Sequence, residues 1–112
     1  GANFDIIANA RIDIEMGRLL VLKTAHIIDT MGAKDAHVWI SKIKVAIPNM
    51  AERIINESIQ MHGAAGISQD FPLAAMWMGT RTLRLADGPD AVHRRQVARR
   101  ELRPYREAFE AK

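Results

Sequence analysis

Apolar residues recur every three or four positions along two successive segments of this chain, each of about thirty residues, and this spacing is typical of one face of a helix. The first segment runs from Asn3 to about Met31, with its main stripe at Ile7, Ala10, Ile14, Gly17, Val21, Thr24, Ile28 and Met31. A second row, at Ile12, Met16, Leu19 and Ile27, makes this helix apolar on two sides, so the rest of the bundle or a partner subunit must cover both. Gly17 on the main stripe predicts a close contact with a neighbouring helix.

The second segment runs from Ala33 to about Met61, and Gly32 before it predicts the end of the first helix. Its stripe consists of Ala36, Ile40, Ile43, Ile47, Met50 and Ile54. Pro48 lies inside the segment, but the stripe keeps its phase across it. This predicts one long helix kinked near residues 44–47, with two separate helices as the alternative. Because the connection between the segments is so short, their helices are expected to be antiparallel.

Glycine and proline divide the rest of the chain into shorter elements. In order, these are a left-handed helix end at Gly63, a loop to Asp70, a helix from about Pro72 to Leu85, a turn at residues 87–90, and a helix from Pro89 to about Leu102 that Pro104 ends. Aromatic residues make up only 5% of the sequence, which argues against strands. We therefore expect an all-α fold, an antiparallel four-helix bundle with two long and two short helices, in one domain over residues 1–112.

The composition excludes several classes of site. The sequence has no cysteine, which excludes disulfides and thiolate metal ligands and permits a cytoplasmic location, the one we expect. No metal site is expected, because the four histidines are scattered without metal-ligand spacing: His26, His37, His62 and His93. No apolar run approaches the roughly 20 residues of a membrane span, and no signal peptide is visible.

Positive charge gathers towards the C-terminus. Between Arg81 and Arg106 there are eight arginines and three acidic residues, and such a block can bind the phosphates of nucleic acid or of a nucleotide cofactor. No aromatic residues alternate with these arginines, as a nucleic-acid surface would usually require. A solvated helix face is therefore the favoured interpretation, and no nucleic-acid partner is expected.

The stretch from Ile59 to Val92 contains four of the seven glycines and an acidic turn, Ala86-Asp87-Gly88-Pro89-Asp90. Glycine lets the backbone approach a group outside the core, so candidate functional positions lie here. The sequence contains no nucleotide-binding fingerprint and no nucleophile elbow. Taken alone, these residues establish only a helical bundle with an exposed acidic turn.

Four motifs in and after this stretch carry a resemblance to a known family. They are Gln60-Met61-His62-Gly63-Ala64-Ala65-Gly66, Gln69-Asp70-Phe71-Pro72-Leu73, Arg81-Thr82-Leu83-Arg84-Leu85-Ala86-Asp87-Gly88 and Ala98-Arg99-Arg100-Glu101-Leu102. In order and spacing they resemble the C-terminal domain of flavin-dependent acyl-CoA dehydrogenases, over essentially the whole chain. The family's N-terminal helical and middle β domains have no counterpart here. The resemblance therefore implies a fragment or a separately expressed domain that is inactive alone.

The resemblance implies α,β-dehydrogenation of an acyl-CoA thioester, in which a carboxylate removes the α-proton and FAD accepts hydride from the β carbon. Many family members use a glutamate before the last helix; Asp87 stands at the matching position, and Gly88 would let the substrate thioester approach the backbone. Aspartate is shorter by about 1 Å, and a branch of the family with this pattern resembles enzymes for longer or hydroxylated acyl chains. The alternative role of Asp87 is helix capping, but Pro89 as the first helical residue would leave Asp87 outside the cap position.

The resemblance also implies that Gln60, Gly63 and Ala64 lie against the FAD of a neighbouring subunit, with backbone amides near its pyrophosphate, and that Asp90 contacts the cofactor. Arg84 would serve either the cofactor or an ion pair. FAD and the acyl-CoA substrate would be bound only by the full-length enzyme, as a homodimer or homotetramer. The alternative function is a non-catalytic helical dimerisation module.

Overall fold

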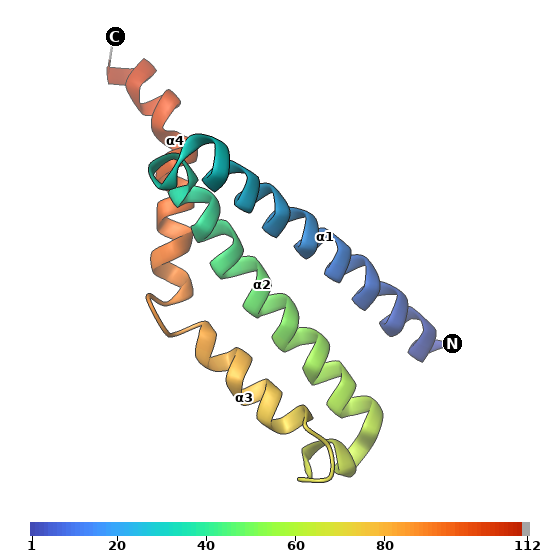
Figure 1. Ribbon diagram of the computed structural model, residues 1–112. Coiled ribbons are helices and arrows are strands. Elements are labelled where there is room, and N and C mark those ends of the chain that lie inside the picture. The colour runs from blue at the N-terminus through green and yellow to red at the C-terminus, as the bar shows by residue number, and fades with distance from the viewer. Residues whose placement is uncertain (111–112) are drawn as a thin grey trace.

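The computed structural model describes residues 1–110, which form four α-helices and one short 3₁₀ helix (Figure 1). In order they are α1 (Ala2–Met31), α2 (Ala33–His62), the 3₁₀ helix η1 (Gly63–Ile67), α3 (Leu73–Leu83) and α4 (Asp90–Glu110). The predicted all-α fold with four helices is confirmed. None of the described helices is both long and apolar enough to cross a membrane.

α2 is the central element of the fold. α1 packs antiparallel along one side of it, and α3 and α4 follow one another back along another side (Figure 1). Within the described residues, α1 contacts α2 alone. A β-carbon at Gly17 would lie 3.0 Å from Ile47 Cδ1 and 3.1 Å from Met50 Sδ, so the close helix contact predicted for Gly17 is confirmed.

The ends of the long helices follow the prediction closely. Gly32 ends α1 with φ 84°, and its N–H donates to Ile28 O. α2 runs through Pro48 as one helix, so the alternative of two separate helices is wrong. Gly63 ends α2 at φ 66°, but its ψ of −145° lies in an extended region open only to glycine and not in the predicted left-handed helical region. The loop expected after Gly63 begins with the short helix η1.

The prediction that Pro104 ends the last helix is wrong, because α4 continues through it to Glu110. Proline removes one amide donor, but the residues that follow favour helix, and an ion pair from Arg106 Nε to Glu110 Oε1 at 3.0 Å spans the last turn. The helix also begins one residue later than expected. The N–H of Val92 donates to Pro89 O at 3.0 Å, so Pro89 precedes the first helical residue.

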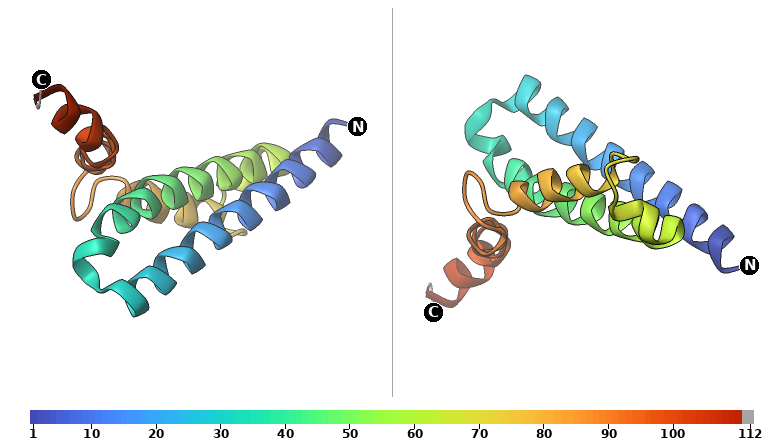
Figure 2. Two further views of the ribbon diagram at one scale, coloured as in Figure 1. Left: turned by 90° about the horizontal axis from the view of Figure 1, so that it is seen from above. Right: turned by 90° about the horizontal axis from the view of Figure 1, so that it is seen from below.

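The core of the described chain is small. Its buried apolar residues are Ile27, Ala36 and Ile55, whereas large apolar side chains on α1 are exposed, as in Phe4 at 77% and Leu19 at 66%. The molecule measures 60 × 30 × 29 Å, and the last turns of α4 extend beyond the other helices (Figure 2). Much apolar surface therefore has no partner within the described residues.

Candidate active-site loop

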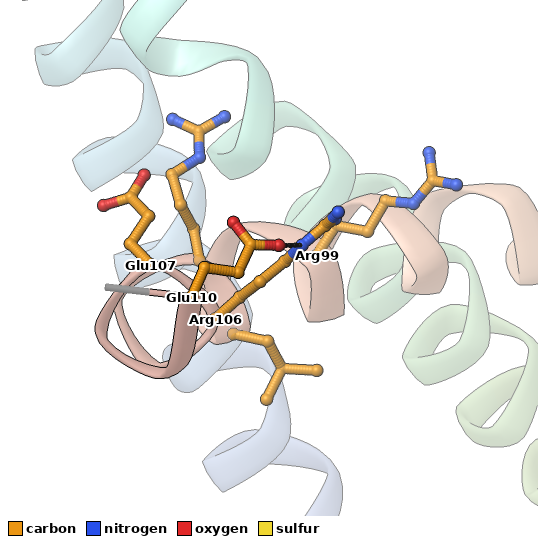
Figure 3. A pocket seen from close by; sticks show the side chains of 6 residues that line it. Arg99, Arg106, Glu107 and Glu110 are labelled. Carbon is orange, nitrogen blue, oxygen red and sulfur yellow. Dashed lines mark hydrogen bonds and ion pairs between the residues drawn. The ribbon is translucent and has the colours of Figure 1, made fainter. Parts of the chain in front are cut away.

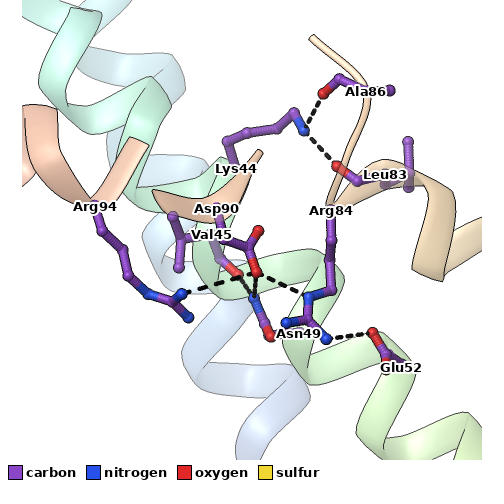
Figure 4. Close-up of polar contacts among 9 residues, drawn as sticks. All are labelled: Lys44, Val45, Asn49, Glu52, Leu83, Arg84, Ala86, Asp90 and Arg94. Atoms are coloured by element: carbon purple, nitrogen blue, oxygen red, sulfur yellow. Dashed lines mark hydrogen bonds and ion pairs between the residues drawn. The ribbon is translucent and has the colours of Figure 1, made fainter. Parts of the chain in front are cut away.

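The acidic turn lies in the loop between α3 and α4, and α2 holds the first part of this loop. Lys44 Nζ donates to the carbonyl oxygens of Leu83 and Ala86, the latter at 2.7 Å (Figure 4). Leu83 is the last residue of α3, and Ala86 follows three positions later. At this end of a helix the backbone oxygens lack helical N–H partners and carry the negative end of the helix dipole. Lys44 therefore caps α3 and fixes the start of the loop.

Asp90 holds the other end of the loop. It is only 8% exposed, and its Oδ2 accepts hydrogen bonds from Arg84 Nε at 2.8 Å and from Asn49 Nδ2 at 3.1 Å (Figure 4). Arg84 NH1 in turn donates to Glu52 Oε2 at 2.9 Å. Because Arg84 precedes the acidic turn and Asp90 follows it, one network of charges closes the loop and joins it to α2.

Arg84 and Asp90 in this network have shifted pKa values. Burial raises the pKa of the Asp90 carboxyl, but hydrogen bonds from Arg84 and Asn49 and the charges of Arg84 and Arg94 outweigh it, so the pKa lies below its usual value. Hydrogen bonds to Glu52 and then to Asp90 raise the pKa of the Arg84 guanidinium. Of the two roles expected for Arg84, the structure shows the ion pair. Asp90 Oδ2 is bonded within the chain, and the cofactor contact expected of Asp90 stays a prediction.

Asp87 stands at the turn of the loop with an unusual backbone. Its φ of 54° is the one positive value at a non-glycine position in the described chain, and Gly88 follows with φ 100°. The Asp87 side chain is exposed, and the loop is tied through the backbone oxygen of Asp87, which lies 3.2 Å from His93 Nε2. Asp87 also lies three positions before the first residue of α4, outside the capping position. The Asp87 carboxylate is therefore not the N-terminal cap of α4.

The residues expected to contact a cofactor lie at the far end of α2 (Figure 1). Gln60 in its last turn and Ala64 in η1 are exposed, with Gly63 between them. Gln60 follows Lys44 by sixteen positions on the same helix, roughly 24 Å at 1.5 Å per residue. The fold therefore brings Gln60, Gly63 and Ala64 together but does not bring them to Asp87 within one chain.

The side chains of α2 that hold the loop were not identified from the sequence. They are Ser41, Lys44, Asn49 and Glu52. Their spacing of three to five residues places them on one side of α2, and this polar row was the signal available. Their partners lie 32 to 55 residues away along the chain, and periodicity carries no information on such pairs.

One shallow surface hollow adjoins the charge network that closes this loop, and it is lined by Asn49, Glu52, Arg53, Asn56, Trp77 and Arg84. Another hollow is lined by α4 side chains alone, and those of Arg99, Arg106 and Glu107 point in different directions from one helix (Figure 3). A groove between α2 and α4 is basic and is lined by Lys34, Asp35, His37, Val38, Gln96, Arg99, Arg100 and Arg103. Within residues 1–110, no three His, Cys, Asp or Glu side chains gather as metal ligands would.

Known proteins share both the sequence and the fold of this chain. Residues 5–102 match the model of the acyl-CoA dehydrogenase C-terminal domain. Human acyl-CoA dehydrogenase family member 11 is 51% identical over 106 residues, which are 95% of this chain and 14% of that protein. Mouse acyl-CoA dehydrogenase family member 10 is 50% identical over 97 residues, which are 87% of this chain and 9% of that protein.

A solved structure shows the same similarity at the level of the fold. The solved structure is that of a Mycobacterium abscessus protein provisionally assigned as an acyl-CoA dehydrogenase. It superposes on this chain with a TM-score of 0.91 at 56% sequence identity. The match covers 94% of this chain and 26% of that one. The chain thus spans about a quarter or less of the length of these relatives.

Proposed function

Because this chain belongs to the acyl-CoA dehydrogenase family and corresponds to its C-terminal domain, we propose that it supplies the catalytic base of such an enzyme, Asp87. The carboxylate of Asp87 would take the proton α to the thioester carbonyl of an acyl-CoA substrate. Gly88 beside it would let the thioester approach the backbone, whose N–H groups are the donors that stabilise a developing enolate oxygen. The substrate we propose is a longer or hydroxylated acyl chain, because the Ala86-Asp87-Gly88-Pro89-Asp90 pattern resembles the branch of the family that acts on such chains.

One observation carries this proposal: the Asp87 side chain is exposed on a loop whose backbone is held by other residues. A general base has to be free of structural bonds and yet fixed in position. Lys44 holds the backbone just before Asp87. The ion pair between Arg84, which precedes Asp87, and Asp90, which follows it, joins the two ends of the loop. The Asp87 carboxylate contributes to neither tie, so it is available for proton transfer.

The second part of the proposal concerns FAD, which supplies the acceptor for the hydride from the β carbon when it is bound. We assign Gln60, Gly63 and Ala64 to the FAD of a neighbouring subunit. Two features support this: nothing lies within 4 Å of where a β-carbon of Gly63 would be, so its backbone is open to a ligand, and the group lies far from Asp87 along α2. We assign Asp90 to fixing the loop through its bonds to Arg84 and Asn49.

The exposed apolar surface supports an assembly. Large apolar side chains of α1, among them Ile12, Met16 and Leu19, would be covered in a homodimer or homotetramer that also includes the remaining parts of the enzyme. The isolated chain would then be inactive. A non-catalytic dimerisation module would use the same surface, but it would give no reason for a fixed loop with an exposed carboxylate.

The test is the Asp87→Asn variant of the full-length protein that contains this chain. Turnover of acyl-CoA should fall about 10²-fold or more, the usual contribution of a general base, while the flavin content stays unchanged. Asp29→Asn, at an exposed position on α1, is the matched control and should keep its turnover. Near-normal turnover in a flavin-loaded Asp87→Asn enzyme would remove the base assignment and favour the dimerisation module.

A further inference from the structure

His93 connects the loop of the candidate base to the central helix. Its Nε2 lies 3.2 Å from the carbonyl oxygen of Asp87, and its Nδ1 lies 3.2 Å from Ser41 Oγ on α2. A carbonyl oxygen only accepts, so Nε2 must carry the hydrogen of the first bond. One side chain in the first turns of α4 therefore spans the distance between α2 and the backbone of Asp87.

Ser41 fixes the position of the imidazole ring. It is completely buried, and its Oγ also lies within hydrogen-bond distance of the side-chain amide of Gln96, one turn further along α4 than His93. With Nε2 as the donor of the ring, Nδ1 accepts the single hydrogen of this buried hydroxyl, so the ring cannot move away from Ser41 without losing that bond. The orientation of the His93 ring is therefore fixed by α2 as well as by its own rotamer.

The bond from His93 acts at the residue whose backbone most needs support. Asp87 has φ 54°, a left-handed conformation that is unfavourable for a residue with a side chain. The ring also closes on the next residue, since a β-carbon at Gly88 would lie 3.0 Å from His93 Nε2. Lys44 holds the carbonyl one position earlier, at Ala86, and does not reach Asp87 itself.

We propose that His93 is a positioning residue for Asp87, holding it through Nε2 in the left-handed conformation that leaves its carboxylate exposed. This role rests on the proposed function of Asp87 as the base. His93 acts on the backbone and has no contact with substrate in this role. Its loss should therefore slow proton transfer while leaving substrate binding in place.

The test compares His93→Ala, His93→Gln and the control His26→Ala in the full-length enzyme. In His93→Ala, kcat should fall about tenfold to a hundredfold with KM within about twofold, because a displacement near 1 Å misplaces a base without removing binding contacts. His93→Gln should recover most of the loss, since its amide can donate to the same carbonyl oxygen. His26, exposed on α1, should be replaceable without effect. A purely structural role for His93 would produce neither the selective fall in kcat nor the recovery with glutamine.

Unchanged kcat in His93→Ala, or a glutamine variant as slow as the alanine variant, would overturn the positioning role. If His93→Ala does not fold, Ser41→Ala removes the anchor of the ring instead and should give the same selective fall in kcat. Unchanged kcat in a folded Ser41→Ala enzyme would count against the role equally.

Amide hydrogen exchange tests the tie without any assay of activity. The N–H groups of Ala86 and Asp90 donate to Thr82 O at 2.9 Å and to Arg84 O at 3.2 Å, and both should exchange faster in the His93 and Ser41 alanine variants. Exchange rates equal to those of the wild type would contradict the bond between His93 and the Asp87 carbonyl.

Slow turnover in Asp87→Asn with full activity in His93→Ala would remove the positioning role alone. Full activity in Asp87→Asn would remove the proposed function. The exchange rates would then be the test of whether His93 holds the Asp87 backbone.

Discussion

At the scale of single residues, Gly66 and Gly79 show how differently two glycines in helical segments are surrounded. A β-carbon at Gly66 would lie 2.6 Å from the backbone oxygen of Ile59, whereas a β-carbon at Gly79 would meet nothing within 4 Å. Gly66→Ala should therefore destabilise the chain by about 1–3 kcal/mol, because backbone atoms have to shift. Gly79→Ala should stabilise it by about 0.5–1 kcal/mol through helix propensity. Urea unfolding followed by circular dichroism measures both, and a shift of the same sign in the two variants would contradict the packing of η1 on α2.

Asp90 gives the fold a defined sensitivity to acid. Its pKa is lower in the folded chain than in the unfolded chain, so the folded state binds fewer protons. The stabilisation from Asp90 is fully present above about pH 4 and is lost as the pH falls through the lowered folded value. Asp90→Asn should reduce stability at neutral pH and flatten the loss of unfolding free energy below about pH 4. Denaturant unfolding over a pH series checks this, and an equally steep acid loss in the variant would show that other groups cause it.

At the scale of helices, Lys44 on α2 caps the C-terminal end of α3. Lys44→Met keeps the helix propensity and the apolar stem of the side chain but removes the charge-assisted bonds to the carbonyls of Leu83 and Ala86. The free energy of unfolding should fall by about 1–2 kcal/mol. Lys34→Met, at an exposed position at the start of α2, should change it by less than about 0.5 kcal/mol. Equal stability of the two variants in urea titration would contradict the capping role of Lys44.

The helices themselves could be predicted from the sequence, but not all of their ends. A stripe with period near 3.6 identified α1 and α2, and glycines at positive φ marked where both end. Pro104 misled the prediction for α4, because its cost is local and the helix-favouring residues after it, with the Arg106–Glu110 pair, continue the helix. In this chain, a proline is thus weaker evidence for the end of a helix than a glycine with positive φ.

At the scale of the whole molecule, the chain is elongated and its core is small. Its radius of gyration is 17.7 Å, whereas a compact domain of this length would have about 13 Å. This shape and the exposed apolar face of α1 agree with the proposal that the face is covered in an assembly. The two-sided apolar pattern of α1 predicted such a requirement from the sequence.

The candidate site was predictable only in part. Asp87 and Gly88 were found through a family motif, and their chemistry stays a prediction. The residues that hold them, such as Ser41 and His93, are 52 positions apart and meet only because α4 runs back along α2. Asp90 carries the same charge as Asp87 three positions away, but only the fold shows that one is buried in a network and the other exposed.

The rate of flavin reduction tests the central claim most directly, when the full-length enzyme is mixed rapidly and without oxygen with acyl-CoA. This single turnover reports abstraction of the α-proton with hydride transfer and excludes product release. With Asp87 as the base, flavin bleaching in Asp87→Asn should be slower by about 10²-fold or more than in the wild type at equal flavin content. Bleaching of the Asp87→Asn flavin at the wild-type rate would contradict the claim.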